Sequence, residues 1–210
     1  FYDAGVGTGN ALDKLTGGAF GVGLNDNIKD AYRFLTKEYQ PGDEVFLFGF
    51  SRGAYTVRST VGMIRKCGIL RTEDENRLEE AFTIYRKDHE TADDPEPRAF
   101  RETYCHPQDR IAFLGVWDTV GALGIPLAGL RFLTRQPYQF HDTRLSKLVK
   151  HACHAVAVDE RRGSFTPTLW DAAPGVDQVV EQSWFTGVHS DIGGGYENRV
   201  RRHSSVPLTP

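Results

Sequence analysis

The sequence predicts an α/β domain in which helices flank a mostly parallel sheet. The first observation is that short, nearly continuous apolar runs alternate with segments of helical periodicity, as expected for strands buried on both faces of a sheet. The second is the motif Gly49-Phe50-Ser51-Arg52-Gly53, which stands between one such run and a helical segment. The third is the composition, because 210 residues with 40% hydrophobic and 25% charged residues suit one sizeable globular core.

The first half of the chain predicts the order helix, strand, helix. Loop-like, glycine-rich sequence at 4–9 and 17–23 precedes a helix, whose apolar face comprises Ile28, Ala31, Tyr32, Leu35 and Tyr39. A turn at 40–43 leads into a strand at 44–48. The helix after the motif ends before Gly68, a position suited to a left-handed C-cap, and its apolar stripe comprises Ala54, Val57, Val61 and Ile64.

The second half predicts further helices and strands in alternation. A helix is expected at 78–85, followed by a charged, proline-broken loop at 89–98 and by a strand at 110–117 that ends at Asp118. Apolar spacing then predicts another helix, which runs through Leu145, Leu148, Val149 and Ala152. Two more strands follow, at 154–158 and 179–185.

Two segments are not predicted to form regular structure. The apolar stretch 120–133 is interrupted by glycine and proline, and it is interpreted either as a lid or substrate wall or as packing filler. Residues 197–210 are polar and basic and lack periodicity, so a disordered tail is predicted. The sequence therefore divides into one α/β domain at 1–196 and this tail.

The composition argues against several classes of function. A net charge of −3 provides no basic field, so no nucleic-acid partner is expected. The three cysteines have no CxxC spacing, which indicates neither a disulfide framework nor a zinc site. The loop at 4–9 matches neither phosphate-binding glycine motif, and no cofactor is expected. No apolar run approaches the ~18 residues of a membrane span, and no signal peptide is visible.

Ser51 is the candidate nucleophile. A strand, Gly-x-Ser-x-Gly and a helix in immediate succession form the context of a nucleophile elbow, a sharp turn that lifts the serine hydroxyl above the sheet. Its two glycines, Gly49 and Gly53, would let the backbones of strand and helix pass closely. The backbone N–H of Arg52, at the helix N-terminus, would face a developing oxyanion. The alternative interpretation is a serine in an ordinary glycine turn.

A serine nucleophile needs a base, and the base needs an acid that orients it. In α/β-hydrolases these residues follow in the order serine, acid, histidine, each at the carboxyl end of a strand. His189 follows the last predicted strand and opens a glycine-rich loop, whereas His151 and His154 lie around a predicted helix and are interpreted as structural. Both Asp118 and Asp159 end predicted strands, so spacing alone leaves the acid undecided.

Two other interpretations share this fold. Asp118, His189 and Asp191 are residue types that bind metal ions, although nothing establishes a ligand spacing among them. The second alternative is a hydrolase-like module without catalysis, which would act in binding or scaffolding.

Five ordered segments together resemble one known family. They are Tyr-Asp-Ala-Gly-Val-Gly-Thr-Gly at 2–9, Gly-Phe-Ser-Arg-Gly-Ala at 49–54, Gly-Val-Trp-Asp-Thr-Val-Gly at 115–121, Val-Asp-Glu-Arg-Arg at 158–162, and Gly-Val-His-Ser-Asp-Ile-Gly-Gly-Gly-Tyr at 187–196. In this order they are similar to the α/β-hydrolase family that includes catalytic domains of bacterial type VI secretion phospholipase effectors. The resemblance covers about 1–196.

The resemblance implies a triad of Ser51, Asp118 and His189, and it selects Asp118 over Asp159 as the acid. It implies hydrolysis of carboxylic esters, of phospholipids or other lipids, through an acyl-enzyme. A lipid or small-ester substrate, peripheral membrane contact, and a cytoplasmic location or export by a leaderless route are expected. The family's first strand, with an Asp-Gly-Thr segment where a second oxyanion donor is expected, would precede Phe1. The N-terminal strand of the sheet is therefore expected to be missing.

Overall fold

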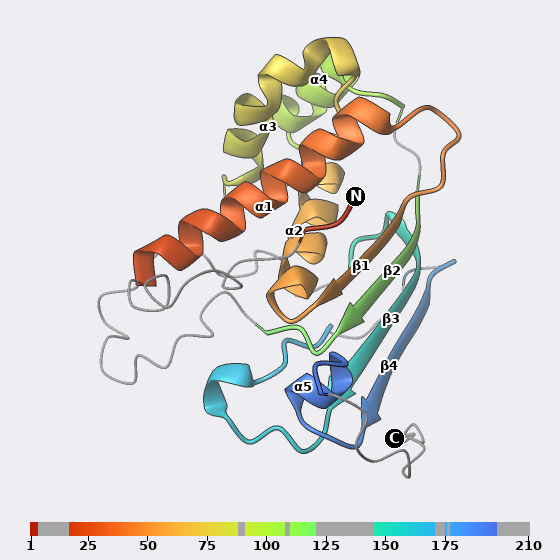
Figure 1. Ribbon diagram of the computed structural model, residues 1–210. Helices are drawn as coiled ribbons and strands as arrows, with labels where there is room; N and C mark the ends of the chain where they lie inside the picture. Colours follow the sequence, from red (N-terminus) through yellow and green to blue (C-terminus); the bar gives the residue numbers. More distant parts are fainter. Residues whose placement is uncertain are drawn as a thin grey trace.

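The computed structural model describes residues 1–3, 17–87, 91–107, 110–120, 145–170, 175 and 177–196. Its centre is a sheet of four strands in the order β1-β2-β3-β4, in which each neighbouring pair is parallel. The strands are β1 (Phe46–Phe50), β2 (Ile111–Trp117), β3 (Val149–Ala157) and β4 (Val179–Phe185). All four carboxyl ends therefore lie at one edge of the sheet (Figure 1), and the predicted α/β class is confirmed.

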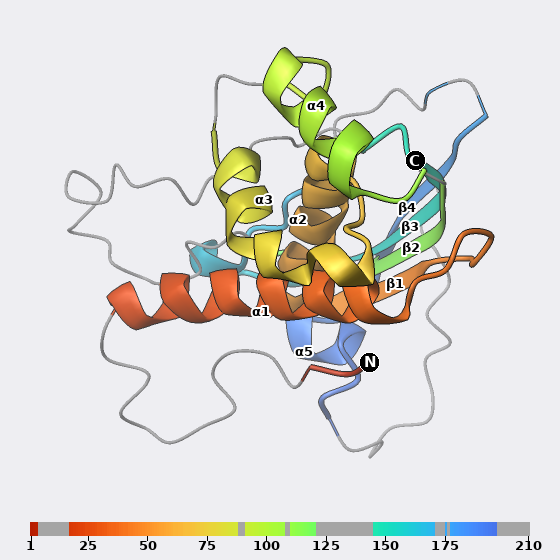
Figure 2. The ribbon, with the colours of Figure 1, turned by 90° about the horizontal axis from the view of Figure 1, so that it is seen from above.

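Four helices gather on one side of this sheet (Figures 1 and 2): α1 (Gly17–Glu38), α2 (Arg52–Cys67), α3 (Leu78–Tyr85) and α4 (Pro95–Tyr104). Among them α2 is central, because it packs on β1 and contacts α1, α3 and α4. The short helix α5 (His189–Ile192) lies against β3, at the carboxyl ends of the strands (Figure 1). Two 3₁₀ helices, at Thr72–Arg77 and Gly163–Phe165, complete the described elements.

The hydrophobic core lies between the sheet and these helices. Leu114 and Ala152 pair in register on β2 and β3 and are almost fully buried, as are core residues of the helices such as Tyr32, Met63 and Ile64. The alternate side chains of each strand point to the opposite face of the sheet. On β1 these are Phe46, Phe48 and Phe50, which are exposed. Burial of one face and exposure of aromatic rings on the other follow from the two-residue period of a strand.

Most of the predicted elements are confirmed, but the helix expected through 145–152 is wrong. β3 begins at Val149, five residues earlier than the predicted strand, and it carries both His151 and His154. The apolar residues at 145, 148, 149 and 152 fit a helical period by coincidence, because 145 and 148 precede β3 and, within it, Val149 and Ala152 lie on opposite faces of the strand.

Two predicted loops are also wrong. Residues 17–23 form the first turns of α1 despite their glycines, because a helix propagates at little cost from its strongly apolar part downstream. Residues 95–104 form α4, whose Pro95 and Pro97 lie in the first turn, where helical N–H groups have no partner inside the helix. The loop at 4–9, the stretch 121–133 and the tail at 197–210 lie outside the described residues.

Candidate active site

Ser51 lies at the junction between β1 and α2. Its backbone N–H donates to the carbonyl oxygen of Trp117 at 2.9 Å, which continues the β1–β2 pairing by one residue, and α2 begins at the next residue, Arg52. The φ angle of Ser51 is 58°, in the left-handed region that costs energy for residues other than glycine. Such a conformation persists only where the surroundings impose it, as a strand that turns directly into a packed helix does here.

Gly49 is the residue that makes this turn possible. A Cβ atom at Gly49 would lie 2.4 Å from the carbonyl oxygen of Gly53, closer than any side-chain carbon tolerates. A Cβ atom at Gly53 itself would meet no described atom within 4 Å. The expectation that both glycines are needed for close passage is therefore correct for Gly49 and wrong for Gly53, whose backbone rather than missing side chain forms the contact.

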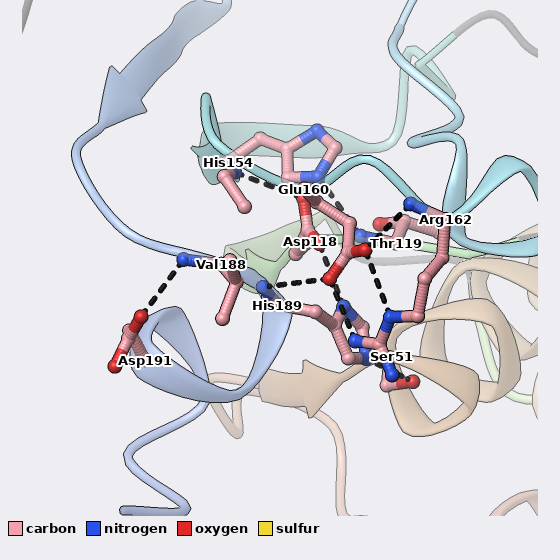
Figure 3. A network of polar contacts seen from close by, with 10 residues as sticks. Ser51, Asp118, Thr119, His154, Glu160, Arg162, Val188, His189 and Asp191 are labelled. Carbon is pink, nitrogen blue, oxygen red and sulfur yellow. Dashed lines mark hydrogen bonds and ion pairs between the residues drawn. The ribbon is translucent and has the colours of Figure 1, made fainter.

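Ser51, His189 and Asp118 form one chain of hydrogen bonds across three elements (Figure 3). Nε2 of His189 lies 2.8 Å from Oγ of Ser51, and Nδ1 lies 2.6 Å from Oδ2 of Asp118. A carboxylate only accepts, so Nδ1 carries the imidazole proton and Nε2 is left to accept the serine hydroxyl proton. His189 and Asp118 are 4% and 0% exposed, so the low local dielectric strengthens both interactions.

Asp118 is held rigidly at the end of β2. Its N–H donates to the carbonyl oxygen of Ala155 at 2.7 Å, and its Oδ1 accepts the N–H of Ala157 at 3.0 Å. Its φ angle of 39° is again left-handed. Because Oδ1 is occupied by a backbone donor of β3, only Oδ2 is available to His189, and the carboxylate has a single orientation.

Aromatic rings enclose the imidazole of His189. The Phe50 ring lies 4.6 Å from it, centroid to centroid, and the Phe165 ring meets it edge-on at 4.7 Å. The backbone N–H of His189 donates to Glu160 at 3.3 Å. Arg162 binds the same carboxylate through two side-chain hydrogen bonds, which lower the pKa of Glu160 to about 2. Glu160 and Phe165 thus hold His189 in position. No local sequence signal indicated this role.

The two other candidate carboxylates do not join this chain. Asp159 is exposed, and its Oδ2 accepts the N–H of Gly187 at 2.7 Å, so it shapes the turn before α5. Asp191 is also exposed and accepts the N–H of Val188 at 2.8 Å, which closes the first turn of α5 (Figure 3). The alternative metal set of Asp118, His189 and Asp191 is thereby divided between two separate hydrogen-bond systems.

The imidazole of His154 links Thr119, the residue after Asp118, to Gln182 of β4. Its Nε2 accepts the N–H of Thr119 at 3.2 Å, and its Nδ1 lies 3.2 Å from Oε1 of Gln182. The imidazole is therefore neutral with its proton on Nδ1. His154 is only 2% exposed, and burial lowers its pKa to about 4. A histidine that the sequence presented as structural is thus part of the support for Asp118.

Acid is expected to destabilise the fold through His154. Its pKa falls from 6.5 to about 4 on folding, so between these values the unfolded chain binds a proton that the folded chain does not. This contribution to stability is complete above pH 6.5 and is lost as the pH falls from 6.5 toward 4. At about 1.4 kcal/mol per pKa unit the loss is roughly 3 kcal/mol.

Urea unfolding at pH 7 and pH 4.5 measures this loss, with His154→Gln beside the wild type. The free energy of unfolding of the variant should fall less between the two pH values. Equal falls in both proteins would show that other groups carry the acid sensitivity.

The fold and the geometry of the site can be compared with a known class of enzymes. In this α/β domain a serine at a strand–helix turn contacts a histidine that follows β4, and the histidine contacts a buried aspartate at the end of β2. This arrangement is the one found in serine hydrolases of the α/β-hydrolase type. The chain belongs to the family described as T6SS, Phospholipase effector Tle1-like, catalytic domain, whose model matches residues 1–209. The family predicted from the five sequence motifs is thereby confirmed.

Two individual proteins show the extent of the similarity. The uncharacterised protein YEL023C of Saccharomyces cerevisiae is 32% identical over 181 residues, which are 82% of this chain and 25% of that protein. The structure of the Tle1 effector bound to the VgrG spike from the Type 6 secretion system aligns with 85% of this chain and 31% of its own, at 21% identity and a TM-score of 0.45. The chain thus spans about a quarter of the yeast relative. None of the described helices has the length and apolar character needed to cross a membrane.

Proposed function

We propose that this domain is a serine hydrolase that cleaves carboxylic esters of lipids through an acyl-enzyme, with Ser51 as nucleophile, His189 as general base and Asp118 as the orienting acid. The observation that carries the proposal is the continuous chain from Ser51 Oγ through His189 to Asp118, with contacts of 2.8 and 2.6 Å. Each contact joins a group to the partner that its chemical role requires.

In the first half-reaction Oγ of Ser51 attacks the ester carbonyl carbon while Nε2 of His189 takes the hydroxyl proton. Asp118 stabilises the imidazolium that forms and keeps its Nδ1–H in place. The tetrahedral intermediate then collapses, the bond to the leaving alkoxide breaks, and His189 returns the proton to it. The products are an alcohol and an ester of Ser51.

In the second half-reaction water attacks the acyl-enzyme, again with His189 as the base, and releases the carboxylic acid. The negative charge that develops on the carbonyl oxygen in both steps needs hydrogen-bond donors. The backbone N–H of Arg52 is the donor we assign, because it belongs to the first residue of α2, and the N–H groups of a first helical turn point out of the helix toward an anion. Such a donor contributes about 10² to 10³ in rate.

A lipid substrate is supported by the family, whose name specifies phospholipase effectors. The chemistry of the site also suits an apolar ester, since Phe50 and Phe165 line the base and exclude water from it. Contact with a membrane surface follows from such a substrate. The apolar stretch 120–133, read from the sequence as a lid or substrate wall, remains a proposal for the segment that binds the acyl chain.

A fluorophosphonate probe tests the proposal, because it modifies only an activated serine. Labelling of the wild-type protein that disappears in Ser51→Ala is the expected result. A Ser190→Ala variant, at a half-buried residue of α5 whose hydroxyl lies outside the chain from Ser51 to Asp118, is the matched control and should label as the wild type does. A folded wild-type protein that is not labelled would instead support a hydrolase-like module without catalysis.

The class of substrate needs a separate measurement. The wild-type protein should release fatty acid from phosphatidylcholine vesicles, and Ser51→Ala should not. Turnover of a soluble acetate ester without any release from vesicles would retain the serine hydrolase and contradict the lipid substrate.

A further inference from the structure

A second cluster of reactive side chains lies on the sheet, away from the proposed triad. His151 and Cys153 occupy alternate positions of β3 and therefore point to the same face. Glu181 of β4 pairs in register with Cys153 and joins them on that face. Cys153 lies four residues before Ala157, whose N–H binds the carboxylate of Asp118. The cluster is therefore separated from the triad by about 13 Å along β3.

The distances within this cluster match the ligand spacing of a tetrahedral zinc site. Nε2 of His151 lies 3.6 Å from Sγ of Cys153 and 3.6 Å from a carboxylate oxygen of Glu181, and all three atoms lie within 4.8 Å of one another. Zinc bonds of about 2.3 Å to sulfur and about 2.0–2.1 Å to nitrogen or oxygen, at tetrahedral angles, place ligand atoms roughly 3.3–3.6 Å apart. Two of the three distances between ligand atoms, from Nε2 of His151 to the sulfur and to the carboxylate oxygen, already have this length.

Hydrogen bonding explains only part of the cluster: at 3.6 Å the Cys153 thiol lies within hydrogen-bond distance of Nε2 of His151, and a bond that it donates leaves no proton on Nε2 for Glu181. Nε2 of His151 faces both a thiol and a carboxylate at the same distance, yet a single nitrogen either accepts from the thiol or donates to the carboxylate. A separation of 3.6 Å is also too long for a hydrogen bond between nitrogen and oxygen. A cation between the three atoms satisfies all of them together, because each offers it a lone pair.

The surroundings favour a site that is ordered and still open to solvent. The Phe113 ring packs edge-on against His151 at 5.2 Å, which fixes the plane of the imidazole. The side chains of His151 and Glu181 are 41% and 64% exposed, so an ion can enter and Glu181 can turn to shorten the third distance. These side chains come from two adjacent strands, and an ion held by them would tie β3 to β4.

We propose that His151, Cys153 and Glu181 bind one Zn²⁺ ion, with water as the fourth ligand. Nε2 of neutral His151, the thiolate of Cys153 and one oxygen of Glu181 are the protein ligands, and the thiol proton passes to solvent when the ion binds. The site joins two strands and takes no part in the proposed ester hydrolysis. No ligand spacing in the sequence indicated it, because the pairing of β3 with β4 creates it.

Zinc titration of the purified protein, stripped with a chelator and kept in a non-chelating reductant, tests the proposal. We expect one equivalent of Zn²⁺ to bind to the wild type, and Zn²⁺ at about 100 times its dissociation constant to raise the melting temperature by roughly 5–10 °C. Cobalt(II) in place of zinc should show a thiolate-to-metal charge-transfer band, which reports the Cys153 ligand directly.

Two conservative variants locate the ion. Cys153→Ser should abolish the cobalt band and weaken zinc binding by more than about 100-fold. Loss of a residue that only hydrogen-bonds to a metal ligand already costs up to about 100-fold, and loss of the ligand itself should cost more. Glu181→Gln changes an exposed side chain, is not expected to impair folding, and should also weaken binding strongly. Glu102→Gln on α4 is the matched control and should bind as the wild type does. Absence of stoichiometric binding, or binding that survives in both Cys153→Ser and Glu181→Gln, would overturn the proposal.

Discussion

Asp118→Asn is expected to lower kcat for ester hydrolysis by about 10⁴-fold while leaving KM nearly unchanged. The amide has one oxygen and one NH₂ group, and the N–H of Ala157, 3.0 Å from Oδ1, selects the oxygen for that position. The NH₂ group then faces Nδ1 of His189, which must become an acceptor, so the imidazole proton moves to Nε2. A histidine in that tautomer cannot take the proton of Ser51, and the charge that stabilised its cation is lost.

Asp159→Asn is the matched control for this prediction, because the two aspartates end successive strands. Asp159 accepts one backbone N–H at the protein surface, and the asparagine oxygen can accept the same bond. We therefore expect kcat of Asp159→Asn to stay within a few fold of the wild type. A comparable loss in both variants, or the reverse ranking, would contradict the assignment of Asp118. Steady-state kinetics with a p-nitrophenyl ester measures both.

Gly49→Ala is expected to destabilise the domain by about 3 kcal/mol or more, at or above the usual range for overpacking a core. The new methyl group would lie 2.4–2.6 Å from the backbone of Gly53 and Ala54, and backbone atoms cannot rotate away as a side chain does. Relief requires β1 and the first turn of α2 to separate, which also moves Ser51 away from His189. Urea unfolding measures the first effect, and probe labelling of the folded fraction measures the second.

Gly53→Ala tests whether the close approach itself is responsible. A Cβ atom at Gly53 meets no described atom within 4 Å, and alanine is the better helix former by about 0.5–1 kcal/mol. We expect this variant to be as stable as the wild type or slightly more stable. If both glycine variants lose the same stability, the turn is limited by backbone flexibility and not by contact.

The site was predictable from the sequence only in part. Ser51 could be predicted because a nucleophile elbow is a local motif, whose whole pattern lies in five consecutive residues and the segments on either side. The spacing of residues in the sequence could not distinguish Asp118 from Asp159, since each follows a strand at the same edge of the sheet. The resemblance selected Asp118. In the structure its carboxylate, and not that of Asp159, contacts the imidazole of His189, because the N–H of Ala157 binds one oxygen and leaves the other for Nδ1.

By itself the sequence determined the class of fold, the order of most elements and the position of the elbow, because apolar runs and helical periods are local consequences of which faces are buried. Only the tertiary structure decided that Val149 begins β3, that Pro95 opens a helix, and that Glu160, Phe165 and His154 support the site. The same holds for the juxtaposition of Cys153 with Glu181. These features depend on strand register and on contacts between residues far apart in the chain. A one-residue change of register would reverse which face His154, Cys153 or Glu181 occupies.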